Sequence, residues 1–235
     1  MTDEMTGGHV LPDGRRAAMR EQEIRTGLAW LHAADPVLAQ VIDDHPDFDP
    51  DAWVRRLPAM DLFGALIFAI IGQQISVTAA TAIFARLTVR FGGRVPAAGE
   101  LAAVDQETLR GIGLSWRKAA TVVDLAQRFS DGRLSEAELR ELPDEEVIRR
   151  LSEVKGIGAW TVQGALLIAL RRPDVIRPDD LALRQAIKAH YGLDRLPAPA
   201  EVADLAERWR PYRSLASSLL LAAARSSSTF KRRRQ

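Results

Sequence analysis

VKGIGAWTVQGALLIALRRPDVIRPDDL, residues 154–181, is the stretch that decides the predicted fold. It contains two predicted helix starts, a Gly-Ile-Gly turn at residues 156–158 and, further along, Pro178-Asp179-Asp180. Glycine permits positive φ and lets another group approach the backbone closely. The first amides of the helix after the turn can then face an anion such as a phosphate. An ordinary helix–helix turn that uses glycine only for its geometry stays open.

The two acidic residues after Pro178 indicate a division of roles. The helix dipole favours an ionised carboxylate at a helix start, and most acids there act as caps. With Asp179 and Asp180 adjacent, one can cap the helix while the other points into a cleft. An ionised aspartate there can stabilise an oxocarbenium-like sugar or activate water. A phosphate-binding turn followed by a carboxylate therefore favours an enzyme that acts on a nucleic-acid strand.

A pair of glutamines, Gln73 and Gln74, follows the apolar run that begins at Leu62. Buried glutamines without partners would be costly. The pair is either a solvent-facing helix end or a loop whose side chains fill the gap left when a base leaves the stack. A second Gly-Ile-Gly turn, at residues 111–113, is interpreted as mainly structural, with Lys118 as a candidate phosphate contact.

Composition narrows the classes of protein. The 235 residues carry a net charge of only +1, so any nucleic-acid footprint must be a local patch. The absence of cysteine excludes disulfides, thiolate zinc sites and iron–sulfur clusters, and four dispersed histidines argue against a histidine metal site. The start of the chain has no secretory apolar region, and no apolar run is long enough to span a bilayer. We expect a soluble cytoplasmic protein.

Apolar residues recur at helical spacing along most of the chain, and no alternating strand pattern of useful length occurs, so we expect an all-α fold. Residues 1–22 are polar with several Gly and Pro, which predicts a disordered tail. The last predicted helix ends at Ala224. Residues 226–235 are interpreted as a basic tail that either solubilises the protein or contacts phosphates nonspecifically.

Six segments together resemble one known family. The chain is similar to the helix–hairpin–helix (HhH-GPD) DNA glycosylase superfamily and, within it, to the AlkA-like 3-methyladenine DNA glycosylase II group. The similarity runs from about Asp35 to Ala224, and its specificity comes from the order and spacing of the segments. They are DPVLAQVI (35–42), LFGALIFAIIGQQIS (62–76), GLSWRKA (113–119), VKGIGAWTVQGALLIAL (154–170), DVIRPDDLALRQA (174–186) and ERWRPYRSLAS (207–217).

The resemblance implies a two-lobed all-α fold with the active site in a cleft between the lobes. The middle lobe would span about residues 61–175, and the other lobe residues 23–60 plus 176–225. Asp180 matches the catalytic aspartate of the family, which leaves Asp179 as the cap or a neighbour. The implied activity is that of a monofunctional glycosylase of base-excision repair, which hydrolyses the N-glycosidic bond of alkylated purines such as 3-methyladenine and 7-methylguanine.

Trp160 stands where bifunctional members carry a Schiff-base lysine, so the resemblance implies no abasic-site lyase activity. An indole face attracts a positively charged alkylated purine by about 0.5–2 kcal/mol. A structural role for Trp160 in the core stays open. Gly164 and Leu221 replace aromatics that some relatives have around the base. The pocket would then be roomier and more aliphatic, and the preferred lesion stays open.

The resemblance also implies which residues contact DNA, the expected partner being duplex DNA with damaged bases. One of the two glutamines would enter the duplex. The hairpin would hold a phosphate, and a monovalent cation could bridge that phosphate to the backbone of residues 154–158. We expect no iron–sulfur cluster, no zinc and no membrane partner. We also expect a monomeric, bacterial-type protein that associates with the nucleoid through its function. Two alternatives stay open: a non-catalytic DNA-binding or damage-sensing module, and a glycosylase for deaminated or oxidised bases. The hairpin residues are Lys155, Gly156, Ile157 and Gly158.

Overall fold

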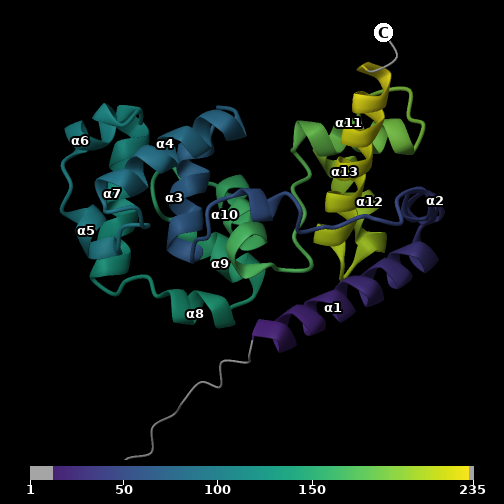
Figure 1. Cartoon of the computed structure of the whole chain (residues 1–235), viewed down its shortest axis with the longest axis horizontal. Helices are drawn as coiled ribbons and strands as arrows, with labels where there is room; N and C mark the ends of the chain where they lie inside the picture. Colours follow the sequence, from purple (N-terminus) through teal and green to yellow (C-terminus); the bar gives the residue numbers. More distant parts are fainter. Residues whose placement is uncertain (1–12, 233–235) are drawn as a thin grey trace, which may run out of the picture. The chain divides into compact units, whose positions relative to one another are not determined.

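The computed structural model describes residues 13–232, with side chains described for Arg15 and residues 18–226. Between residues 13 and 232 the backbone forms helices joined by turns and contains no strand, which confirms the expected all-α class. The chain divides into two compact units. The first, as far as it is described, comprises residues 13–50 and 178–232, and the second comprises Asp51–Arg177 (Figure 1).

The first unit joins the two ends of the chain. Helix α13 packs against α1, α2 and α11. The centre holds a fully buried carboxylate, Asp35, which caps α2 by accepting from the amides of Val37 and Leu38. Tyr191 and Trp209 donate to the other oxygen of Asp35 at 2.7 and 3.2 Å. The elements of this unit are α1 (Asp13–Ala34), α2 (Pro36–Asp44), α11 (Leu181–His190), α12 (Pro199–Ala206), η3 (Glu207–Trp209) and α13 (Arg213–Arg232).

Both ends of the chain are more helical than predicted. Residues 13–22, predicted as part of a disordered tail, belong to α1, so that prediction was wrong for them. From Arg15 onward the segment is rich in Ala, Arg, Glu and Met, which are strong helix formers, and their propensity outweighs the preceding Pro and Gly signals. Helix α13 continues to Arg232, beyond the end predicted at Ala224. Residues 1–12 and 233–235 lie outside the described residues.

The second unit is built around α3, whose residues Leu62–Ile71 are all buried. Helices α4, α7 and α10 pack against α3 (Figure 1). Asp61 caps α3 by accepting from the amide of Gly64 at 2.7 Å. The elements are η1 (Val54–Arg56), α3 (Leu62–Gly72), α4 (Val77–Arg90), α5 (Ala98–Ala102), α6 (Gln106–Gly111), α7 (Trp116–Ser130), α8 (Glu136–Glu141), α9 (Asp144–Leu151), α10 (Ala159–Ala165) and the π-helical η2 (Leu166–Leu170).

Residues 51–60 belong to this second unit and not, as predicted, to the lobe formed by the two ends of the chain. Leu57 and Met60 pack against the core cluster around α3, and Asp51 forms an ion pair with Arg171 at 3.3 Å. These contacts join residues that are far apart in the sequence, so local sequence patterns do not reveal them. Within the described part of the chain, no helix is both long and apolar enough to cross a membrane.

Candidate functional site

The Gly-Ile-Gly turn joins α9 to α10, as the sequence predicts, and the packing of the second unit restricts two of its three residues. Gly156 has φ +95, and a Cβ atom there would lie 2.4 Å from Oγ1 of Thr121 on α7. Only glycine therefore fits this position without strain. The Ile157 side chain is buried in the core of the unit, so only the backbone of Ile157 can face a ligand.

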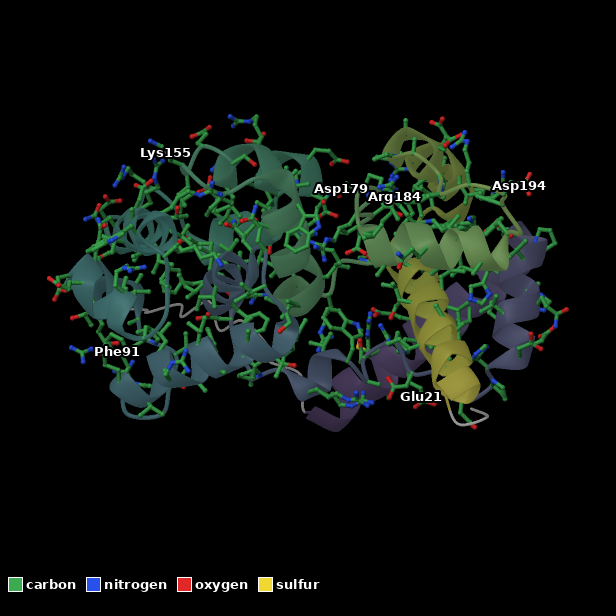
Figure 2. The ribbon with its side chains drawn as sticks, turned by 90° about the horizontal axis from the view of Figure 1, so that it is seen from above. Glu21, Phe91, Lys155, Asp179, Arg184 and Asp194 are labelled. Atoms are coloured by element: carbon green, nitrogen blue, oxygen red, sulfur yellow. The ribbon has the colours of Figure 1, made fainter. Side chains whose placement is uncertain are left out.

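The outer side of the hairpin can hold an anion. Gly158 is the N-cap of α10 and offers no side chain to the first amides of that helix. The amides of Ala159 and Trp160 have no acceptor within the helix, whereas those of Thr161 and Val162 donate to the Gly158 carbonyl. Lys155, directly before the turn, is exposed and lies at the rim of the second unit in Figure 2. The turn thus combines amide donors at a helix start with one cationic side chain.

The two glutamines have different environments. Gln73 is half-buried, and its Nε2 donates to the carbonyl of Gly156 and to Oγ1 of Thr161, both at 3.0 Å. Gln74 is exposed and has φ +60, in the left-handed region. Gln73 therefore ties its loop to the hairpin, whereas Gln74 presents its amide side chain to solvent. Of the two predicted DNA-contacting glutamines, Gln74 is the more exposed.

Lys118, expected as a candidate phosphate contact, is used inside the protein. Its Nζ donates to the carbonyls of Ile71 and Gln73, each at 2.7 Å, at the C-terminal end of α3. Burial, with a smaller effect from the neighbouring Arg117, lowers the pKa of Lys118. Two of the three donors of the ammonium group are therefore used within the protein, in a direction that depends on packing between helices, and the phosphate contact stays a prediction.

Trp160 is the second residue of α10 and is 38% exposed, so its side chain is not fully enclosed in the core. The guanidinium carbon of Arg177 lies 3.6 Å from the centroid of the Trp160 ring, in cation–π contact. Sequence analysis did not single out Arg177. One sequence signal for Arg177 was available. Arg177 directly precedes Pro178, and a residue before proline is biased to extended backbone and away from a helix.

Gly164, four residues after Trp160, shares its helix face. It is buried, yet a Cβ atom added there would meet nothing within 4 Å, so a larger side chain has room at this point. Leu221 lies on α13 in the first unit and is half-buried. The residues predicted to line the base pocket therefore belong to different units: Trp160 and Gly164 to the second, and Leu221 to the first.

Asp180 is the N-cap of α11, and its Oδ1 accepts from the amide of Leu183 at 3.0 Å. Asp179 is exposed (Figure 2). Asp179, expected as the cap or a neighbour, is the neighbour, because the helix begins at Leu181 and the residue directly before it reaches the third amide. A carboxylate has two oxygens, so capping by Oδ1 is compatible with chemistry at Oδ2.

Three of the hairpin carbonyls accept hydrogen bonds within the protein. Val154 accepts from the amide of Ile157 at 3.0 Å, Lys155 accepts from the Thr121 hydroxyl at 2.9 Å, and Gly156 accepts from Gln73. Each oxygen keeps a second lone pair, so these hydrogen bonds are compatible with the monovalent cation that we expect at this turn. Among the described side chains, no group of three or more His, Cys, Asp or Glu could hold a metal ion.

Comparison with known proteins places this geometry in a family. Residues 67–211 match the family described as HhH-GPD superfamily base excision DNA repair protein. The Bacillus subtilis protein YfjP is 33% identical over 226 residues, which are 94% of this chain and 76% of that protein. DNA-3-methyladenine glycosylase 1 of Schizosaccharomyces pombe is 33% identical over 165 residues, 69% of this chain and 72% of that protein.

A solved structure is similar over most of the chain. The 3-methyladenine DNA glycosylase Mag1 of Schizosaccharomyces pombe, in complex with abasic DNA, matches with a TM-score of 0.75 and 29% identity. The match covers 83% of this chain and 95% of the Mag1 chain. The family match includes the glutamine loop, the hairpin and the Pro-Asp-Asp segment, and it spans more than half of the sequence. The chain belongs to the HhH-GPD superfamily of base excision DNA repair proteins.

Proposed function

We propose that this protein is a monofunctional DNA glycosylase that hydrolyses the N-glycosidic bond of alkylated purines in duplex DNA. The observation that carries the proposal is the glycine hairpin before α10 followed by Asp180 at the start of α11, in a chain that belongs to this superfamily. The relatives named as DNA-3-methyladenine glycosylases support alkylated purines as the substrate class.

DNA binding would use the outer side of the hairpin. The first amides of α10 bind a backbone phosphate, and Lys155 adds a positive charge. The hairpin backbone at residues 154–158 would hold a monovalent cation, which would supply further positive charge for the phosphate. Gln74 enters the duplex while the damaged base leaves the stack. The hydrogen bonds of Gln73 to Gly156 and Thr161 keep the glutamine loop and the hairpin in one arrangement. We propose that the protein acts as a monomer on duplex DNA.

Asp180 would carry the chemistry. As the bond between the sugar C1′ and the base breaks, its electron pair goes to the base and positive charge develops on the sugar. The Asp180 carboxylate stabilises that charge and directs a water molecule to C1′, and the proton of the water passes to solvent. Because an alkylated purine is already positively charged, it leaves without a strong general acid. Hydrolysis of this kind needs no iron–sulfur cluster or zinc.

Trp160 would receive the flipped base through its exposed ring. An indole cannot form a Schiff base with the sugar, so the product is an intact strand with an abasic site. This absence of lyase activity separates the proposed enzyme from bifunctional members of the family, which cut the strand after removing the base.

The test is a panel of duplexes that contain 3-methyladenine, 7-methylguanine, hypoxanthine, ethenoadenine, 8-oxoguanine or uracil. Strand breaks are measured with and without alkali after incubation with the full-length protein. We expect release of the alkylated purines and breaks only after alkali. Binding without release of any base would instead indicate a non-catalytic damage-sensing module. Release restricted to deaminated or oxidised bases would move the substrate class away from alkylation damage.

A further inference from the structure

We propose that Arg177 competes with the flipped base for Trp160 and thereby lowers the preference of the enzyme for positively charged over neutral bases. The inference rests on the proposed function, because it takes the Trp160 ring as the surface that receives the base. It goes beyond that function by assigning a specificity-determining role to a residue outside the hairpin, the glutamine loop and the Pro-Asp-Asp segment.

The observation that carries the proposal is the contact between the two side chains. The Arg177 guanidinium carbon lies 3.6 Å from the Trp160 ring centroid, which is stacking distance. Both residues belong to the second unit, so the contact is made within one compact body. A guanidinium is planar and always charged, and it stacks well on an aromatic face. The ring therefore already holds a cation of the kind that an alkylated purine would provide.

A second cation is disfavoured wherever it approaches the ring. On the same face, the alkylated base must first displace the guanidinium and lose the favourable contact that Arg177 makes with Trp160. On the opposite face, the charge of Arg177 draws on the same ring quadrupole and repels the incoming charge. Since the cation–π contact corresponds to about a 2- to 30-fold factor in an equilibrium constant, the penalty for a charged base should be of that size.

A neutral base meets a smaller penalty. It can displace the guanidinium without charge repulsion. Arg177 therefore acts on the difference between charged and neutral bases. A change that removes only its charge should raise the preference for charged bases.

The first test measures binding of two free nucleosides to the full-length protein by equilibrium dialysis in mildly acidic buffer. 7-Methylguanosine is positively charged there, whereas guanosine is neutral. We expect Arg177→Gln to raise the affinity ratio of 7-methylguanosine to guanosine by about 2- to 30-fold relative to wild type. Arg177→Lys keeps the charge but stacks less well, so its ratio should lie between the two. A ratio that stays constant or falls in Arg177→Gln overturns the proposal.

A matched control lies in the same unit. Arg110 makes a second cation–π contact, 5.0 Å from the ring centroid of Trp116. Arg110→Gln removes one cation from one tryptophan just as Arg177→Gln does, and it should leave the nucleoside ratio unchanged. An equal change in both variants would mean that lost surface charge, and not access to Trp160, caused the effect, and would also overturn the proposal. Thermal melting checks that both variants are folded.

The second test measures kcat/KM for release of 7-methylguanine and hypoxanthine from matched duplexes. The ratio should rise in Arg177→Gln by a similar factor, and adding Trp160→Leu should abolish the rise. If bases are released but neither ratio changes, the role of Arg177 is refuted while the glycosylase activity stands. If no variant releases any base but the nucleoside ratio changes as expected, the proposed function fails while the competition at Trp160 is supported.

Discussion

Replacing Gly156 with alanine should destabilise the protein by about 2–5 kcal/mol. An L-residue at φ +95 is strained by roughly 1–2 kcal/mol. The new methyl group would also lie 2.4 Å from Thr121 Oγ1, so Thr121 must move and weaken its hydrogen bond to the Lys155 carbonyl. Overpacking of this kind typically costs about 1–3 kcal/mol. The two effects together give the predicted loss.

Two other glycines separate these effects. Gly132 has φ +80 but open space around its Cβ position, so Gly132→Ala should show only the backbone cost of roughly 1–2 kcal/mol. Gly164 lies inside α10 and also has open space, so Gly164→Ala should stabilise the protein by about 0.5–1 kcal/mol through helix propensity. The expected order of stability is Gly164→Ala, wild type, Gly132→Ala, Gly156→Ala.

Urea unfolding followed by circular dichroism measures these differences, and thermal melting should agree, at about 2–4 °C per kcal/mol for a chain of this size. The double variant Thr121→Ala with Gly156→Ala removes the atom that the new methyl group meets. Its loss of stability should be at least about 1 kcal/mol smaller than the two single losses added together. If Gly156→Ala is no worse than Gly132→Ala, the close packing of the hairpin against α7 is refuted.

Further predictions concern the glutamine loop and the pH dependence of stability. Gln73→Leu should lower the free energy of unfolding by about 1–3 kcal/mol, because the Gly156 carbonyl and the Thr161 hydroxyl lose their partner. Gln74→Ala should change the free energy of unfolding by less than about 0.5 kcal/mol. Equal losses in urea unfolding would contradict the separate roles. Burial lowers the pKa of His190 from 6.5, so folding favours its neutral form, and its contribution is present above pH 6.5 and lost as the pH falls through the lowered value. Melting temperatures between about pH 7 and pH 5 should therefore fall less in His190→Leu than in wild type, and parallel curves would refute this.

Local sequence signals were sufficient where one helix or turn determines the structure. The unbroken apolar run after Asp61 predicts a buried helix, and α3 is buried along its length. The glycines of the hairpin predict a tight turn, and Gly156 has the positive φ that requires glycine. Pro178 and the two aspartates predict the start of α11. Asp61 and Asp180, which carry two of these signals, also make the local hydrogen bonds that start the helices.

Contacts between segments that are distant in the sequence could not be predicted from local sequence signals. Lys118 was interpreted as a candidate phosphate contact, and its hydrogen bonds to the end of α3 were not foreseen. Arg177 was overlooked although it stacks on Trp160. Both outcomes depend on side-chain directions that packing between helices sets. The sequence left open whether Asp179 is the cap or a neighbour for a different reason. The answer depends on the first residue of α11 to within one position, and helix boundaries are the least predictable feature of a sequence.

The most direct test of the account compares wild type with Asp180→Asn in release of 3-methyladenine and 7-methylguanine from alkylated duplex DNA. Asparagine caps a helix about as well as aspartate, so the variant should melt near the wild-type temperature. The account predicts that wild type releases both bases and that Asp180→Asn is slower by at least about 100-fold, since the charge that stabilises the sugar cation is gone. Full activity in Asp180→Asn, or no release by wild type, would contradict it.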